Sequence, residues 1–275
     1  MCQTIGPVTR RRLRQKRRWP AEVQSAIDDF EAEFSGLSAR MRDRLADAVV
    51  ARDITESGDI NAAVRSVLAE DREELRVVLT EGATNGAEAG RRMASRRFGL
   101  DIDFNVVPQA ALNDLTDFVD DVNDDVLDTI GDGVESTLED AFEDGLDRDA
   151  VADIMQDQLD NELGDAAAQR HARTLVQGAS ERGTHSAIQE SSAIGERWVA
   201  TNDGRTRDTH IEAEGQIVPV ETSFRVGGSR LEHPGDPGGP IEEIANCRCT
   251  AVPVFEGDLT DDEVAVLRAG DRLNV

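Results

Sequence analysis

Two cysteines and two histidines near the C-terminal end of the sequence are the side chains best suited to chemistry. Cys247 and Cys249 stand two residues apart, and His210 and His233 precede them in the same short stretch. Thiolate sulfur and imidazole nitrogen are the ligands that tetrahedral Zn²⁺ prefers, and a small loop-rich segment gains stability from such an ion. The residue types therefore predict one structural zinc ion held by these four side chains.

Two other interpretations of the same four residues stay open. The cysteines can be small buried residues, with the histidines hydrogen-bonded to loop backbone. A disulfide between Cys247 and Cys249 ranks third among the interpretations, because a bridge between residues two apart would be strained.

A different chemistry would use the acids beside the histidines. Asp203 and Asp208 lie close to His210 in the sequence, and such a set around a metal ion is typical of nucleases and hydrolases. In a turn-rich stretch, however, short acids normally bond nearby backbone groups. The motifs GxxxxGK[ST], GxSxG and HExxH do not occur in the sequence. We therefore expect no enzymatic activity, with a metal-dependent nuclease or toxin-like module as the alternative.

The N-terminal stretch carries a cluster of positive charge. The first twenty residues contain no acid, and their basic residues are Arg10, Arg11, Arg12, Arg14, Lys16, Arg17 and Arg18. Each of these side chains can neutralise a phosphate and release a counterion, so residues 1–19 are expected to form a flexible arm that contacts DNA. An acidic protein neighbour, or the acidic remainder of the chain itself, is the alternative partner for the same charges.

The chain as a whole is strongly acidic. Its 56 acidic residues oppose 30 basic ones for a net charge of −26, Lys16 is the one lysine, and tyrosine does not occur. Such a composition is typical of a high-salt cytoplasm, where acidic surface stays hydrated and salt screens its self-repulsion. DNA mimicry and calcium buffering share this charge and remain alternatives. No apolar stretch approaches the roughly 20 residues of a membrane-spanning helix, so no membrane partner is expected.

Long amphipathic helices are expected to precede the Cys/His stretch. Apolar residues recur at steps of three and four after Pro20, after the break at ESGD, and after Pro108. The second of these helices is expected to be interrupted near Gly82 or Gly86, and shorter helices are expected at 148–160 and 166–191. The apolar faces of the long helices must pack on one another or on a partner.

The periodicity changes near Glu196, where short apolar runs separated by Gly and Pro begin. Runs at 198–200, 217–220 and 250–254 predict strands, and Thr260 predicts the N-cap of a last helix over 261–267. The expected fold class is therefore α+β. Its four regions are a basic arm at 1–19, a helical region at 20–192, a loop-rich module at 193–257 and a tail at 258–275.

The order of residues in this module resembles a known family. The segments ERWVATNDGRTRDTH, GQIVP, HPGDP and NCRC follow one another, with Phe224 between the second and the third. This order is similar to that of the C-terminal domain of the phage Mu protein F-like head morphogenesis family, the minor head proteins of tailed viruses. The matching positions are Trp198, Asp203, Arg205, Thr206, His210, Gly215, Pro234, Gly235, Asp236, Cys247, Arg248 and Cys249. Trp198, Asp203, Arg205, Asp208, Asp236 and Arg248 are expected to hold the motif together structurally.

The resemblance implies a virion protein at the portal vertex inside the capsid, present in few copies. Such a protein assists head assembly and the packaging or delivery of the genome, after a stage in the host cytoplasm. Its implied partners are the portal protein and the major capsid protein, with packaged double-stranded DNA on the N-terminal arm. The acidic, lysine-poor composition favours a tailed virus of haloarchaea.

Overall fold

The structure of the chain is a computed structural model that describes residues 19–50, 57–146 and 148–274. The basic residues expected in the arm lie outside these ranges. The chain divides into two compact units. The first contains the described residues up to Ala26, Gly86–Ala111 and the residues from Val176 onward, and the second contains Ile27–Asn85 and Leu112–Leu175.

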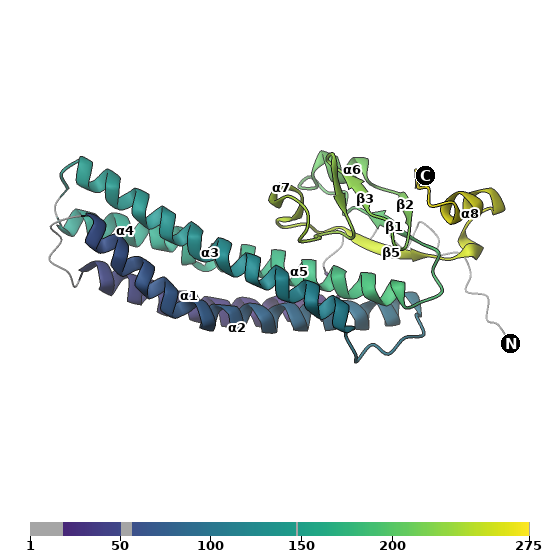
Figure 1. The fold of residues 1–275 in the computed structure, drawn as a ribbon, viewed down its shortest axis with the longest axis horizontal. Helices are drawn as coiled ribbons and strands as arrows, with labels where there is room; N and C mark the ends of the chain where they lie inside the picture. The colour runs from purple at the N-terminus through teal and green to yellow at the C-terminus, as the bar shows by residue number, and fades with distance from the viewer. Residues whose placement is uncertain (1–18, 51–56, 147, 275) are drawn as a thin grey trace. The chain divides into compact units, whose positions relative to one another are not determined.

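The second unit is built from helices. It contains α4, almost all of α3 and parts of α1, α2 and α5. Their bounds are α1 Ala21–Val50, α2 Ser57–Phe98, α3 Gln109–Glu143, α4 Arg148–Leu163 and α5 Asp165–Gln189 (Figure 1). The apolar stripes expected from the sequence form its core, in which Leu37, Leu45, Leu75 and Leu138 are fully buried. The predicted amphipathic helices are therefore confirmed, and they bury their apolar faces against each other.

Helix α2 runs without a break from Ser57 to Phe98, so the expected interruption near Gly82 or Gly86 is wrong. Both glycines serve close packing. A Cβ atom on Gly82 would overlap the ring of Phe30 within the helical unit. A Cβ atom on Gly86 would lie 2.9 Å from the carbonyl oxygen of Val176 within the first unit. A glycine therefore costs α2 some helix propensity but lets a neighbour approach its backbone.

Arginines of α2 pair with acids of α3 in a ladder. Arg65 bonds Glu135 at 2.6 Å, Arg76 bonds Asp120 at 2.6 Å, and Arg72 bonds Asp124 between them. The residue number rises along α2 as it falls along α3, so the two helices run antiparallel. Each pair is exposed to solvent, which weakens it, so the ladder defines register more than it adds stability.

The first unit contains the sheet. Four antiparallel strands lie in the order β5-β1-β2-β6, and a separate hairpin pairs β3 with β4. Their bounds are β1 Gly195–Val199, β2 Gln216–Pro219, β3 Phe224–Val226, β4 Ser229–Leu231, β5 Thr250–Val254 and β6 Leu273–Asn274. Three of these, β1, β2 and β5, confirm the strands predicted from the apolar runs, and the α+β class is confirmed with them.

Short helices complete this unit. They are α6 Asp208–Glu212, α7 Ile241–Ile244 and α8 Asp261–Arg268. The predicted N-cap of the last helix is confirmed, because the Thr260 hydroxyl accepts a hydrogen bond from the backbone N–H of Glu263. The Glu263 carboxylate accepts from the Thr260 backbone in return, which completes a capping box.

Within the first unit, the end of α2 and the second half of α5 touch backbone to backbone. A Cβ atom on Gly90 would overlap the Ser180 carbonyl, and one on Gly183 would overlap the Ala87 carbonyl. Beside this contact, Ala94, Ala187, Ile188 and Ala251 form a buried cluster that joins α2 and α5 to strand β5. The second half of α5 is thereby fixed against the sheet.

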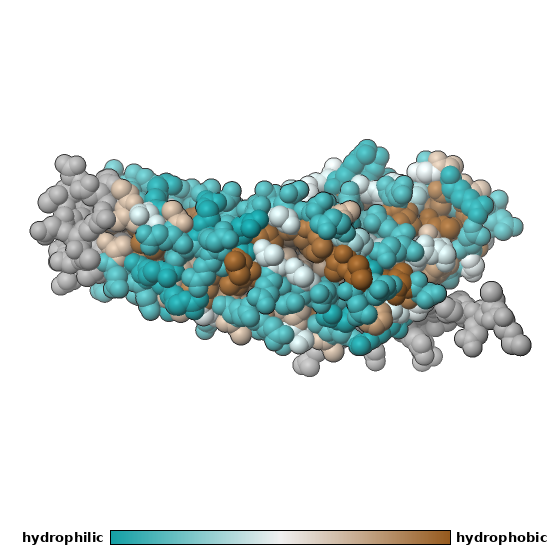
Figure 2. All heavy atoms as spheres, turned by 60° about the horizontal axis from the view of Figure 1, so that its bottom comes forward, coloured by the Kyte–Doolittle hydropathy of each residue, from teal (hydrophilic) through white to brown (hydrophobic). Residues whose placement is uncertain are grey.

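Most of the face in Figure 2 is hydrophilic, and its hydrophobic side chains gather in small patches. Within the part of the chain that the structure describes, no helix combines the length and the apolar character that a membrane crossing requires.

Candidate metal centre

His210, Cys247 and Cys249 meet in the interior of the first unit. His210 lies on α6, and both cysteines lie in the loop before β5. The Nδ1 atom of His210 is 3.2 Å from the sulfur of Cys249 and 3.8 Å from that of Cys247. One ligand atom from each residue falls within 4.8 Å of the others, and each residue is about 2% exposed. This cluster could hold a metal ion, and it contains three of the four side chains that the sequence singled out.

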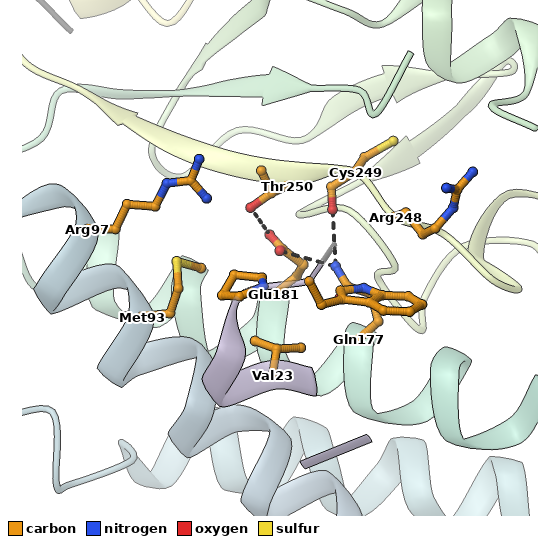
Figure 3. A pocket seen from close by; sticks show the side chains of 10 residues that line it. Val23, Met93, Arg97, Gln177, Glu181, Arg248, Cys249 and Thr250 are labelled. Atoms are coloured by element: carbon orange, nitrogen blue, oxygen red, sulfur yellow. Dashed lines mark hydrogen bonds between the residues drawn. The ribbon is translucent and has the colours of Figure 1, made fainter. Parts of the chain in front are cut away.

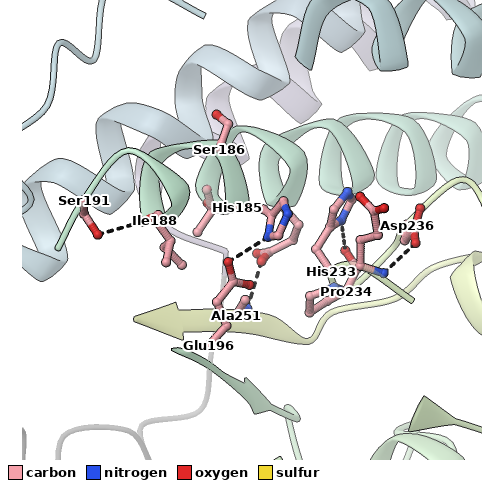
Figure 4. Close-up of polar contacts among 12 residues, drawn as sticks. His185, Ser186, Ile188, Ser191, Glu196, His233, Pro234, Asp236 and Ala251 are labelled. Atoms are coloured by element: carbon pink, nitrogen blue, oxygen red, sulfur yellow. Dashed lines mark hydrogen bonds and ion pairs between the residues drawn. The ribbon is translucent and has the colours of Figure 1, made fainter. Parts of the chain in front are cut away.

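The fourth expected ligand, His233, lies outside this cluster. Its Nδ1 donates to the carbonyl oxygen of Pro234 at 3.1 Å, and its ring centroid is 5.7 Å from that of His185 (Figure 4). Burial lowers the pKa of His233 to about 4, so the ring is neutral at ordinary pH. His233 matches the interpretation in which a histidine bonds loop backbone.

The two cysteine thiols differ in pKa. The hydrogen bond from Cys249 lowers the pKa of Cys247 to about 5, and His210 acts in the same direction although burial opposes it. The same hydrogen bond and burial raise the pKa of Cys249. Cys247 is therefore the more acidic thiol of the pair, and Cys249 is its hydrogen-bond donor. Both sulfurs are free of a disulfide.

Aromatic residues of the motif cover the histidine. The ring of Trp198 meets that of His210 edge-on, with centroids 5.5 Å apart at an interplanar angle of 89°. Phe224 packs on Trp198 in turn at 5.3 Å. All three residues are buried, so this side of the cluster is closed to water.

Glu243 on α7 contacts the opposite nitrogen of the same ring. Its Oε2 is 3.0 Å from the Nε2 of His210 and accepts a second hydrogen bond from the Thr209 hydroxyl at 2.8 Å. Glu243 was not predicted from the sequence, because one acid of the short segment IEEI has no periodicity or spacing that marks it.

Arg248, between the two cysteines, anchors their loop. Its guanidinium donates to both carboxylate oxygens of Asp203, and its carbonyl oxygen accepts from the Thr201 hydroxyl at 2.6 Å. The hydrogen bonds from Arg248 hold the pKa of Asp203 well below its usual range. Asp203 also accepts from the backbone N–H of Arg205 and thereby closes its own turn. The side chains of Arg205 and Asp208, also expected in the motif, are exposed.

The HPGDP segment forms a capped loop. The Asp236 carboxylate accepts from the backbone N–H groups of Glu232 at 2.6 Å and Gly238 at 2.9 Å. Gly235 has a φ of +72°, and a Cβ atom there would lie 3.2 Å from the Cα of Gly178 on α5. A glycine suits this position because it must adopt left-handed backbone and approach a helix closely.

A buried acid on α5 holds the strand that follows Cys249. Glu181 accepts from the Ala251 backbone N–H at 3.0 Å and the Thr250 hydroxyl at 3.1 Å. Gln177, one turn earlier, donates both to Glu181 and to the Cys249 carbonyl oxygen (Figure 3). Burial raises the pKa of Glu181 to about 8, so its carboxyl group is largely protonated at neutral pH.

A second buried pair lies one turn further along α5. His185 and Glu196 meet at 2.7 Å, and both are nearly inaccessible to solvent (Figure 4). Burial raises the pKa of Glu196 although its hydrogen bond to His185 opposes the change. The sequence did not predict this pair, because its two members come from separate elements.

Comparison with known protein families finds a match that covers the motif. Residues 132–252 match the family Phage Mu protein F like protein. This Mu F-like segment begins inside α3, well before the stretch in which the motif residues were recognised, and ends within β5. All the residues of the metal cluster fall inside it.

Two curated proteins resemble parts of the chain. The NAD(+)–arginine ADP-ribosyltransferase EFV of Enterococcus faecalis is 34% identical over 94 residues, which are 33% of this chain and 19% of that protein. The uncharacterized protein YqbB of Bacillus subtilis is 28% identical over 97 residues, 34% of this chain and 32% of that protein. The chain thus spans a fifth to a third of the length of these relatives. No solved structure gives a significant match.

Proposed function

We propose that this protein is a minor head protein of a tailed virus that assists head assembly. The observation that carries the proposal is the match of residues 132–252 to the Mu F-like family. The packing of the motif supports it, since Trp198, Asp203, Arg248 and the two cysteines stabilise one compact centre. The acidic, lysine-poor composition makes a haloarchaeal host our proposed setting.

The proposed place of the protein is the portal vertex inside the capsid, with the portal protein and the major capsid protein as partners. Purified virus particles test this directly. Mild cross-linking followed by mass spectrometry should recover the protein with portal peptides. The proposal would be contradicted if the protein were absent from particles or cross-linked only to host proteins.

The metal cluster is proposed to bind one zinc ion and to act structurally, without enzymatic activity. Its burial supports a structural role, because His210, Cys247 and Cys249 are all buried and Trp198 packs on His210. Zinc analysis and a plasmid-nicking assay with and without chelator test both parts. Bound zinc without nicking is the expected result, and nicking that requires metal would overturn the structural role.

The N-terminal arm is proposed to contact packaged DNA. Its support is the run of seven basic residues ahead of an acidic chain. Deletion of residues 1–19 should lower DNA retention in a low-salt filter assay. A variant with its arginines changed to lysine keeps the charge and should retain DNA. Unchanged retention by the deletion variant would contradict the DNA contact and leave an acidic protein as the partner.

A further inference from the structure

We infer that Glu243 is the positioning residue of the metal centre. Its carboxylate accepts the Nε2 proton of His210 and thereby turns the Nδ1 lone pair toward a zinc ion held by Cys247 and Cys249. The inference rests on the proposed zinc site and deepens it, because it states what selects the ligand atom.

The two nitrogens of the His210 ring face different partners. Nδ1 is 3.2 Å from the Cys249 sulfur, whereas Nε2 is 3.0 Å from the Glu243 carboxylate. A neutral imidazole carries one proton, and a carboxylate accepts that proton in a hydrogen bond. When both cysteines bind a zinc ion, the proton therefore belongs on Nε2, and the Nδ1 lone pair is left for the metal. Metal-bound histidines commonly donate their other N–H to a carboxylate in this way.

Glu243 is itself held in place. The Thr209 hydroxyl donates to the same carboxylate oxygen at 2.8 Å, and the residue is only 8% exposed. The turn between β3 and β4 supplies the space for its other oxygen, because a Cβ atom on Gly227 would overlap Oε1. Gly227 has a φ of +57°, so a larger residue would meet both strain and a clash.

The other sides of the ring are also fixed. Trp198 meets His210 edge-on, and Arg207, at the start of α6, donates to the Ala245 carbonyl oxygen at 2.5 Å. That bond ties α6 to α7, the two helices that carry His210 and Glu243. The ligand and its hydrogen-bond acceptor are therefore held relative to each other before any ion binds, as a preorganised site requires.

The experiment measures zinc affinity and the cobalt spectrum of the full-length protein. The variants are Glu243→Ala, Glu243→Gln and Glu242→Ala, the last being an exposed neighbour on the same helix. Affinity comes from competition with a chromophoric chelator. The absorption bands of bound Co²⁺ report thiolate and imidazole ligation, which a general loss of stability would not change in the same manner.

We expect E243A to bind zinc about 10–100-fold more weakly than the unmodified protein and to alter the cobalt bands. E243Q keeps the shape and one acceptor oxygen, so it should recover part of the affinity, and it carries the test if circular dichroism shows that E243A is unfolded. E242A should match the unmodified protein. Equal affinities and equal spectra for E243Q, E243A and E242A would overturn the positioning role of Glu243 but not the zinc site. Absence of zinc binding and cobalt bands in the unmodified protein would instead overturn the zinc site.

Discussion

Arg248 donates two hydrogen bonds to the carboxylate of Asp203, at 2.5 and 2.7 Å, and so ties the loop between the two cysteines to the turn after β1. Arginine suits this contact because its planar group meets both carboxylate oxygens at once. The pair is partly exposed, so its energy is modest and its main effect is on the position of the loop.

Arg248→Ala should therefore expose the cysteines more than it destabilises the fold. Without zinc, the reaction of Cys247 and Cys249 with a thiol reagent should become several times faster, while the free energy of unfolding falls by about 1 kcal/mol. Arg205→Ala is the control, because its side chain is exposed in the same turn. Equal thiol reactivity in both variants would show that the Asp203 contact does not hold the loop.

The buried Glu181 predicts a pH dependence of stability. Its pKa is about 8 in the folded protein and near 4.5 when exposed, so the folded state holds a proton that the unfolded chain loses. Its contribution is fully present below 4.5 and decreases as the pH rises toward 8. The unmodified protein should lose on the order of 4 kcal/mol of unfolding free energy between about pH 5 and pH 9 from this group. Urea titrations at several pH values measure this.

Glu181→Gln should flatten that dependence, because an amide does not ionise but keeps an oxygen for the Ala251 N–H. Glu190→Gln, directly after the end of the same helix, is a comparison in which the carboxylate is partly exposed and bonded to Arg91. If the E181Q protein shows the same loss as the unmodified one, another group causes it.

The contact between Gly90 and Ser180 predicts an unusual cost for a small substitution. Gly90→Val should lower the free energy of unfolding by about 2–3 kcal/mol, because α2 and α5 must separate to admit the side chain. Gly36→Ala on α1 is the matched control, since a Cβ atom there meets only Arg40 at 3.8 Å. That change should stabilise the protein by up to about 1 kcal/mol. Chemical denaturation of both variants distinguishes crowding from a general response of helical glycines.

The net charge of −26 predicts that salt stabilises this protein. Raising NaCl from 0.1 M to 1 M shortens the screening length from about 10 Å to about 3 Å and weakens repulsion among the acids. The Tm should rise by on the order of 5 °C. The double variant Asp117→Asn and Asp121→Asn, which removes two exposed charges of α3, should gain less from the same salt. A Tm that falls with salt would mean that ion pairs such as Arg76–Asp120 outweigh the repulsion.

Periodicity predicted most of the helices and three strands because these elements bury one regular face. The interruption predicted at the glycines of α2 was wrong, since helix propensity cannot show that the Phe30 ring lies against Gly82 and the Val176 backbone against Gly86. The hairpin of β3 and β4 was missed although Gly227 and Gly228 between alternating residues are a known turn signal.

The candidate site was predictable where residue type alone carries the chemistry. Cys247, Cys249 and His210 were identified in this way, whereas His233 was included only because it is near in sequence. Glu243 could not be found, because its role depends on which nitrogen of a distant ring it faces. Long-range pairing of polar groups leaves no local pattern in a sequence.

The hydrogen bond that Glu181 accepts from Ala251 also affects whether strand β5 can pair with a strand of another molecule. Strand β5 is an outer strand of its sheet, and the outward N–H of Ala251 is already bonded to the Glu181 carboxyl group. Exposed strand edges invite pairing with a strand of another copy, which leads to aggregation. The acid on α5 therefore closes part of this edge to pairing with a strand of another molecule.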